Sequence, residues 1–162
     1  LAVALKFGIR IDLIIRPLDF APMDRILSEI RASAGNIIIN AKKGAVAIRE
    51  ILSKNKIVSI MLDQNASYRD GVYVPFFGRT ACTNKGVALF AMRYGATVLP
   101  IFNIRLADGR YKIIFEKPIS LVHKSGNITI DIINNTILYN SIIEKYVRIA
   151  PESWFWVHRR WW

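Results

Sequence analysis

The sequence contains little cysteine, few acidic residues and no long uncharged apolar run. Cys82 is its single cysteine, so an internal disulfide framework and a multi-cysteine zinc site are both excluded. The longest uncharged stretches, residues 94–104 and 132–143, are much shorter than the ~18–20 apolar residues that a membrane-spanning helix needs. Neither a P-loop nor a G-x-G-x-x-G pattern occurs, so nucleotide binding by those devices is not expected.

The shortage of acidic residues gives the chain a strongly basic character. There are 23 Lys and Arg against 12 Asp and Glu, and the formal net charge is +11. Such a surface attracts phosphates, acidic proteins or anionic lipid. Nucleic acid is the common partner of a small basic domain. Here, however, the aromatic residues lie in apolar contexts and not along a basic groove, so no nucleic acid is expected.

The length and the apolar content predict one folded domain over residues 1–162. Hydrophobic residues make up 52% of the 162 residues, which excludes a disordered chain. Short apolar runs alternate with helical patterns, and Asp108-Gly109 is a strong hairpin signal. The expected strands cover residues 11–15, 37–39, 57–62 and 97–104, and the expected helices follow Pro22, Lys43, Thr83 or Asn84, and Ile130. We therefore predict an α/β layered domain with a mostly parallel central sheet flanked by helices.

Several polar side chains fall near the carboxyl ends of the predicted strands, where α/β sheets collect their ligands. Arg16, followed by a proline, can grip a phosphate with both guanidinium nitrogens. Lys42 lies in a basic stretch that is otherwise typical of a solvated face. Asp63 and Gln64 follow a strand and either point into a cleft or form an Asx turn, and the sequence favours neither.

Aromatic residues concentrate in two segments. Residues 71–78 contain Phe76 and Phe77 between two glycines and form either the apolar wall of an acyl tunnel or an edge strand that feeds the core. All four tryptophans lie in residues 154–162, beside Arg159. For Trp154 and Trp156 a core role is favoured, whereas the last two tryptophans are candidates for a membrane interface.

Catalytic and metal-binding patterns are weak. A histidine base needs a carboxylate to orient it, yet Ile128 stands five positions after His123, and the sequence ends before that position after His158. Neither histidine has a second metal ligand nearby. We therefore name no catalytic residue and expect no metal and no cofactor.

Taken in order, four segments resemble the bacterial lipid A biosynthesis acyltransferases, the lauroyl and myristoyl transferases of lipopolysaccharide assembly. These segments are residues 62–65, 71–79, 98–102 and 152–161. An early segment with Arg16-Pro17-Leu18 and Met23-Asp24-Arg25 is also similar to the family. The resemblance covers nearly the whole chain, from about residue 16 to residue 162, and the order of the segments adds to its specificity.

The resemblance implies a glycerolipid-acyltransferase-like fold and a fatty acyl transfer. In that family the histidine of a His-x-x-x-x-Asp/Glu motif acts as general base on an acceptor hydroxyl, which attacks the thioester of acyl carrier protein. Later blocks of the family bind the acceptor's phosphates and line the acyl site. By position, residues 37–42 resemble the second block, Asp63-Gln64 the third and Leu99-Pro100 the fourth.

The sequence departs from the family because the His-x-x-x-x-Asp/Glu motif is absent from it. We expect an N-terminally truncated, inactive fragment of an enzyme that acylates a lipid A precursor, with acyl carrier protein as the donor. The expected location is the cytoplasmic face of the inner membrane, as a peripheral protein. The alternative is a non-catalytic remnant that binds anionic lipid at the membrane surface. The expected substrate-binding residues are Arg16, Lys42, Asp63, Gln64, Phe76, Phe77, Arg79 and Arg159.

Overall fold

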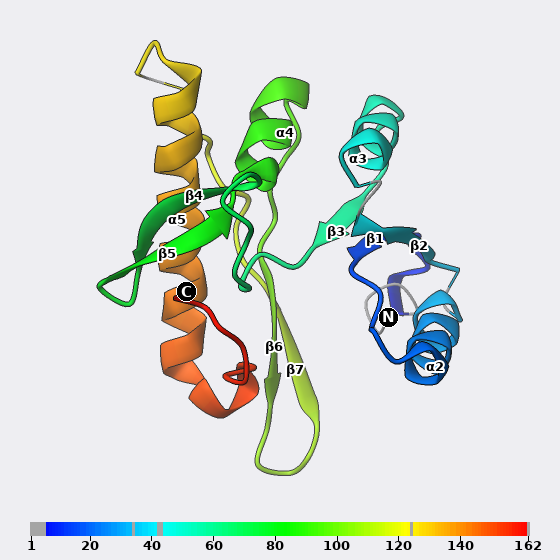
Figure 1. Ribbon diagram of the computed structural model, residues 1–162. Coiled ribbons are helices and arrows are strands. Elements are labelled where there is room, and N and C mark those ends of the chain that lie inside the picture. Colours follow the sequence, from blue (N-terminus) through cyan, green and yellow to red (C-terminus); the bar gives the residue numbers. More distant parts are fainter. Residues whose placement is uncertain (1–5, 34, 42–43, 124, 162) are drawn as a thin grey trace. The chain divides into compact units, whose positions relative to one another are not determined.

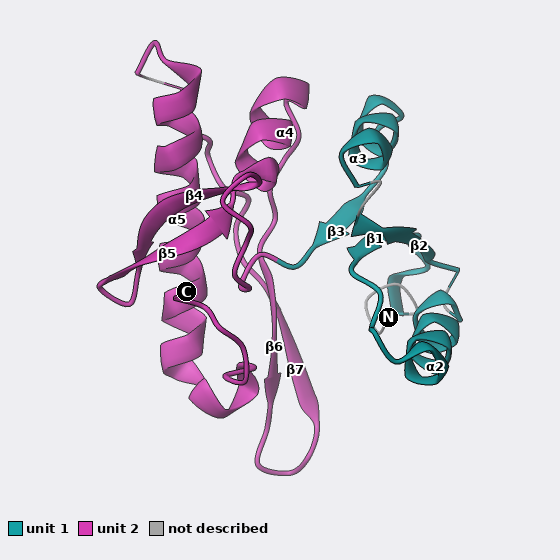
Figure 2. Ribbon diagram, in the orientation of Figure 1, with its two compact units in different colours: residues 1–61 teal, residues 62–162 magenta. Residues whose placement is uncertain are grey.

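The chain divides into two compact units, residues 1–61 and residues 62–162 (Figure 2). The computed structural model describes residues 6–33, 35–41, 44–123 and 125–161. The prediction of one domain over residues 1–162 stays a prediction.

Unit 1 is a small parallel sheet with its connecting helices. Strand β1 (Asp12–Ile15) lies between β2 (Ile37–Asn40) and β3 (Val58–Ile60), and it runs parallel to both. Parallel neighbours need crossover connections, which α2 (Ala21–Ala32) and α3 (Gly44–Ser53) provide. The predicted strands and helices of this region are confirmed, although the third strand is shorter than the predicted residues 57–62.

The two helices of unit 1 differ in how much they bury. Helix α3 buries Ile48 and Ile51, as its apolar spacing predicts. Helix α2 starts with a proline in its first turn and buries none of its residues. Its apolar side chains Met23, Ile26 and Ile30 remain 45–52% exposed, so the apolar stripe of α2 faces away from the sheet of its own unit.

Unit 2 combines two antiparallel hairpins with a long helix (Figure 1). Strand β4 pairs with β5, and β6 pairs with β7. The elements of unit 2 are β4 (Gly71–Phe76), β5 (Arg79–Asn84), α4 (Gly86–Tyr94), β6 (Ile101–Arg105), β7 (Tyr111–Phe115), α5 (Ile128–Ile149) and the short 3-10 helix η2 (Pro151–Ser153).

The first hairpin corrects two expectations. The sequence pattern ended the aromatic segment at Gly78, but Phe77 and Gly78 have φ of 51° and 73° and form a tight turn into a second strand. Two consecutive positive φ angles match the right-handed twist of the paired strands. Neither Thr83 nor Asn84 is the helix cap, because both lie within β5 and the N-cap of α4 is Lys85, without a side-chain capping bond. The carboxamide oxygen of Asn84 does accept the backbone N–H of Gly86 at 2.7 Å.

The second hairpin confirms the signal at Asp108-Gly109. Gly109 has a φ of 82°, and the carboxylate of Asp108 accepts the backbone N–H of Arg110 at 3.0 Å. The strand before this turn begins at Ile101, because Pro100 has no N–H to offer a partner strand. The predicted strand over residues 97–104 is therefore shorter at its start, where only Val98 bridges to Ile119.

Helix α5 organises the core of unit 2. Ile132 and Tyr139 on α5 pack with Ala88 of α4. The helix begins at Asn127, whose side chain accepts the backbone N–H groups of Thr129 and Ile130. This cap satisfies two of the donors that a helix start leaves open.

The chain is therefore of the α/β class. In the residues that the structure describes, three strands form a parallel sheet and four form antiparallel hairpins. The predicted late antiparallel hairpin is confirmed.

Candidate functional site

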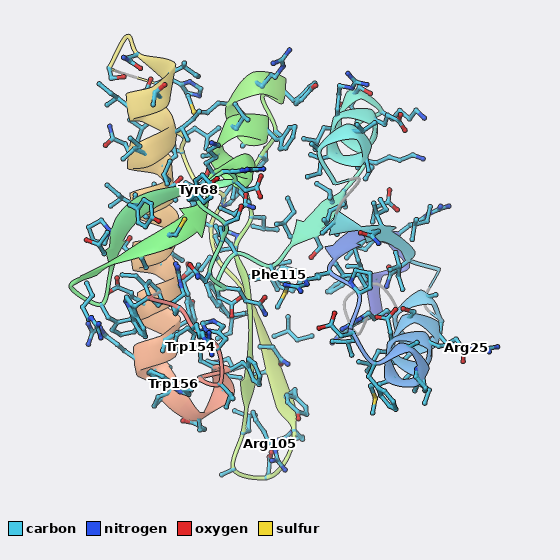
Figure 3. The ribbon with its side chains drawn as sticks, in the orientation of Figure 1. Arg25, Tyr68, Arg105, Phe115, Trp154 and Trp156 are labelled. Atoms are coloured by element: carbon cyan, nitrogen blue, oxygen red, sulfur yellow. The ribbon has the colours of Figure 1, made fainter. Side chains whose placement is uncertain are left out.

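Three segments that are distant in the sequence meet within unit 2. Asp63 follows the unit boundary, Phe76 ends β4, and Trp154 follows η2. The indole N–H of Trp154 donates to the Oδ2 atom of Asp63 at 3.1 Å, and the ring centroids of Trp154 and Phe76 are 5.7 Å apart. Trp154 is labelled in Figure 3. We call Asp63, Phe76, Trp154, Arg160 and Trp161 the C-terminal clasp.

Phe76 occupies the centre of the clasp. Its side chain is fully buried, and the ring of Trp161 lies 5.8 Å from it. The indole N–H of Trp161 donates to the Phe76 carbonyl at 3.1 Å. The final segment of the chain is thus fixed to the end of β4 by both ring packing and a hydrogen bond.

Arg160 is a buried cation in this cluster. It is 1% exposed, and its guanidinium donates to the carbonyl of Cys82 at 2.7 Å and to the hydroxyl of Thr83 at 2.7 Å. The guanidinium carbon lies 4.6 Å from the centroid of the Phe76 ring, close enough for a cation–π interaction. Burial lowers the pKa of Arg160, and the nearby charge of Asp63 opposes this effect.

The partners of Arg160 are neutral, and α5 supplies one of them. Asn140 is fully buried and donates to the Thr83 hydroxyl at 3.1 Å and to the Pro75 carbonyl at 2.9 Å. Its Oδ1 atom lies 3.5 Å from Arg160. Because buried polar groups are costly when unpaired, this network specifies how β4, β5, α5 and the last residues fit together.

The hairpin turn carries the second phenylalanine and further cations. The backbone N–H of Phe77 donates to the carboxylate of Glu144 at 2.8 Å, and the Arg148 guanidinium lies 4.7 Å from the centre of the Phe77 ring. Arg79 lies 5.5 Å from the centre of the Trp161 ring. Exposed positive charge therefore borders the clasp on the side of the turn.

Cys82 does not offer a reactive thiolate. Its thiol is buried and lies 3.6 Å from the carbonyl of Ser67. Burial raises the pKa of Cys82, and the charges of Arg160 and Lys85 only oppose that rise. The side chain is a neutral thiol at pH 7, as expected of a small buried residue.

The structure brings part of the predicted site together. Asp63 and Phe76 belong to the clasp, and Phe77 and Arg79 contact its members Phe76 and Trp161, respectively. Gln64 and Arg159 are exposed in the same unit. Arg16 is exposed directly after β1 of unit 1, and Lys42 lies outside the described residues.

Sequence reasoning missed Arg160 and Asn140, and it did not connect Trp154 with Asp63. An asparagine in the middle of an apolar helical pattern is a signal for a buried hydrogen-bond hub, and Asn140 has that signal. Trp161 is a sequence candidate for a membrane interface, and in the structure its indole N–H donates to the Phe76 carbonyl inside the clasp. Trp162 lies outside the described residues.

The two histidines have different surroundings. His123 is exposed. The imidazole of His158 lies 5.3 Å from the Trp154 ring and 6.3 Å from the Phe155 ring, measured between centroids. Its two nitrogens are buried and have no hydrogen-bond partner among the described residues, so no carboxylate orients this ring as a general base needs.

The chain belongs to the bacterial lipid A biosynthesis acyltransferase family, whose profile matches residues 10–162. It is 28% identical over 150 residues to a lipid A biosynthesis lauroyltransferase of Escherichia coli K12, an alignment that covers 90% of this chain and 46% of that protein. It is 31% identical over 111 residues to a lipid A biosynthesis palmitoleoyltransferase of Escherichia coli K12 and to a lipid A biosynthesis acyltransferase of Shigella flexneri. These alignments cover 67% of this chain and 34% of each of those proteins. The chain thus spans less than half the length of these relatives.

Proposed function

We propose that the chain forms the substrate-binding part of an enzyme that moves a fatty acyl chain from acyl carrier protein to a hydroxyl of a lipid A precursor. Family membership supports acyl transfer in lipid A biosynthesis. The observation that carries the proposal is the clasp itself. The clasp joins three of the segments that resemble the family: Asp63 contacts Trp154, and the end of β4 contacts Trp154 and Trp161.

The proposed roles follow from the chemistry of each side chain. Cations suit the phosphates of the acceptor and the acidic surface of acyl carrier protein, and we assign this role to Arg16, Lys42, Arg79 and Arg159. Asp63 and Gln64 offer oxygens and an amide to acceptor hydroxyls.

Two phenylalanines are proposed to line the acyl chain. Phe77 is half-buried at the hairpin turn and offers an apolar ring face to a ligand. Phe76 is enclosed by the clasp, so its contribution is to support that wall from behind.

The bond-making step needs a general base. In the mechanism that the family resemblance implies, a histidine takes the proton of the acceptor hydroxyl, the oxygen attacks the thioester carbonyl, and the thiol of acyl carrier protein leaves. No His-x-x-x-x-Asp/Glu motif occurs in the 162 residues. We therefore propose that these residues alone bind the substrates without turnover.

We further propose that residues 1–162 form one domain with a mostly parallel central sheet. We also propose that the protein works at the cytoplasmic face of the inner membrane as a peripheral protein. No helix in the described part of the chain is long and apolar enough to span a bilayer. A protein that binds anionic lipid at the membrane surface without chemistry is the second candidate, and the net charge of +11 supports it.

A binding assay combined with a turnover assay tests the proposal. The 162-residue chain is mixed with fatty acyl-[acyl carrier protein] and a phosphorylated lipid A precursor, and the transfer of the acyl chain is followed by mass spectrometry. We expect no turnover and saturable binding of the precursor. Acyl transfer at enzymatic rates by these residues alone would contradict the proposed inactivity.

Arg79→Gln provides the site variant and Arg93→Gln the matched control. Both arginines are exposed, but only Arg79 borders the clasp. Loss of one charge-assisted hydrogen bond should weaken binding of the phosphorylated precursor about tenfold. If Arg93→Gln weakens binding as much as Arg79→Gln, the interaction is diffuse attraction and the proposed site is wrong.

A further inference from the structure

A turn near the end of the chain presents three consecutive large apolar side chains to solvent. Phe155 is 59% exposed, Trp156 is 52% exposed and Val157 is 82% exposed. We call residues 155–157 the apolar tip. A run of this kind is costly in water and marks a contact surface.

The residues on both sides of the apolar tip are held in place by hydrogen bonds. On one side of it, Trp154 is held by Asp63, and on the other side Arg160 and Trp161 are held by β4 and β5. The residues that flank the tip therefore point into unit 2 and are anchored there, and the tip between them projects outward.

Trp156 is exposed in a specific way. Its indole N–H donates to the carbonyl of Pro151 at 2.7 Å, so the polar atom of the ring is satisfied within the protein. The other atoms of the ring are hydrocarbon. The same hydrogen bond ties the tip to η2, which follows α5 and its last residue Ile149, 59% exposed.

Positive charge accompanies this surface. Arg148 is in the last turn of α5, and its side chain is 65% exposed, with one guanidinium nitrogen 3.8 Å from the Glu144 carboxylate. Arg159 is exposed two residues after Val157, and the whole chain has a net charge of +11. Exposed aromatic rings next to arginines fit the boundary between the acyl chains and the phosphates of an anionic bilayer.

We propose that residues 155–157 insert into the interfacial layer of an anionic phospholipid bilayer, with Arg148 and Arg159 at the lipid phosphates. This inference rests on the proposed function in one respect, namely that the protein works at a membrane. An acidic protein would also use the arginines and the aromatic rings, so its binding is the alternative outcome of the test. We assign the tip to lipid because three consecutive exposed apolar side chains with tryptophan among them, next to an arginine, match the interfacial layer of an anionic bilayer.

The test measures partition of the full 162-residue chain onto vesicles of phosphatidylethanolamine and phosphatidylglycerol, and onto neutral phosphatidylcholine vesicles. The tip variant combines Phe155→Ser with Val157→Ser, because neither side chain makes a polar contact in the fold. The controls are Tyr73→Ser on β4 and Ile26→Ser on α2, which replace side chains that are 65% and 52% exposed. Circular dichroism at the start of each titration checks that the variants are folded.

We expect the tip variant to bind anionic vesicles on the order of tenfold more weakly than the unmodified chain, and both controls to stay within about twofold. Binding to neutral vesicles should be weaker, and added salt should weaken binding to the anionic ones. Lipids brominated near the headgroup should quench tryptophan fluorescence, and Trp156→Phe should remove most of that quenching.

Two results would overturn the inference. One is unchanged vesicle binding by the tip variant, and if the tip variant then binds acyl carrier protein more weakly, the occupant of the tip is that protein. The other is a larger loss of vesicle binding in Ile26→Ser than in the tip variant. None of these measurements requires acyl transfer. A tip variant that binds vesicles normally therefore does not contradict the proposed enzymatic function, and a negative acyl-transfer assay does not contradict membrane insertion of the tip.

Discussion

At the scale of single residues, the hydrogen bond between Trp154 and Asp63 is the contact that orients a candidate substrate-binding carboxylate. The indole N–H fixes one carboxylate oxygen and leaves the other to a ligand. Trp154→Phe keeps an aromatic ring against Phe76 and removes the donor together with part of the ring, and a double-mutant cycle separates the loss of packing from the loss of the hydrogen bond. A double-mutant cycle of Trp154→Phe with Asp63→Asn, measured by urea unfolding, should give a coupling energy of about 1 kcal/mol.

Trp156→Phe is the matched control for this cycle, because the indole N–H of Trp156 bonds to the Pro151 carbonyl and not to Asp63. It should show no coupling with Asp63→Asn. Zero coupling for Trp154→Phe as well would mean that the indole does not hold the carboxylate in solution.

Arg160 presents a different case, since burying a guanidinium is costly unless its donors are paired. Its two Nη atoms are paired, whereas its buried Nε atom has no hydrogen-bond partner among the described residues. Its partners Cys82 and Thr83 accept at 2.7 Å, and a single ammonium group cannot reach both in the same planar geometry. Arg160→Lys should therefore lower the free energy of unfolding by about 2–4 kcal/mol. The neighbouring Arg159→Lys, at an exposed position, should change it by less than about 0.5 kcal/mol. Equal effects of the two variants, measured by urea unfolding, would show that the buried network adds nothing to stability.

At the scale of elements, the end of β7 is joined to α5 by a small ionic network. The Glu116 carboxylate accepts from Lys145 at 2.6 Å and from the Tyr146 hydroxyl at 2.6 Å. These bonds, the one from Lys145 first, lower the pKa of Glu116, and the bond to Glu116 raises the pKa of Lys145. The stabilisation by this pair is therefore complete above the carboxyl pKa of about 4.3 and below the ammonium pKa of about 10.4 in the unfolded chain.

This arrangement predicts a pH-dependent difference between the unmodified chain and Glu116→Gln. A lowered carboxyl pKa stabilises the fold above the pKa of about 4.3 in the unfolded chain, and the effect is lost as the pH falls through the lower folded pKa. Urea unfolding should show the variant to be less stable at pH 7 and the difference to shrink at pH 3. Lys145→Met should give the same pattern, and a difference that persists unchanged at pH 3 would refute the role of the pair.

The elements also show what local sequence patterns can predict. The runs of isoleucine at β1 and β2, the proline start of α2 and the Asp108-Gly109 turn are local signals, and each predicted element is present. Strand β5 was missed because its turn has a phenylalanine at positive φ, a conformation for which the sequence carries no local signal. It is stabilised by a distant contact, the bond from the Phe77 N–H to Glu144.

The same limit applies to the candidate site. Strand-end position is a local property, and it singled out Asp63. The partner of Asp63 lies 91 positions along the chain, and the partners of Arg160 are 77 and 78 positions away. Contacts of that range depend on the tertiary fold, which neither spacing nor composition encodes.

At the scale of the whole molecule, the two units bury very different amounts of apolar surface. In the described part of unit 1, Ile48 and Ile51 are the only buried hydrophobic side chains, and α2 buries none of its residues. Unit 2 contains the core around Ile132 and Tyr139 and the aromatic packing of the clasp. A chain of about 60 residues is marginal even with a normal core, so unit 1 lacks the burial that would offset its loss of conformational entropy.

We therefore expect residues 62–162, expressed alone, to keep helix α5 and to unfold cooperatively, and residues 1–61 alone to remain largely unfolded. Far-UV circular dichroism and hydrogen exchange of the two pieces and of the full chain test this expectation. Protection of the β1 amides in the full chain but not in residues 1–61 would show that unit 1 folds only with help from the rest of the chain, as a single domain requires. Cooperative unfolding of residues 1–61 by themselves would instead establish two independent domains, because this segment would then be stable without the rest of the chain.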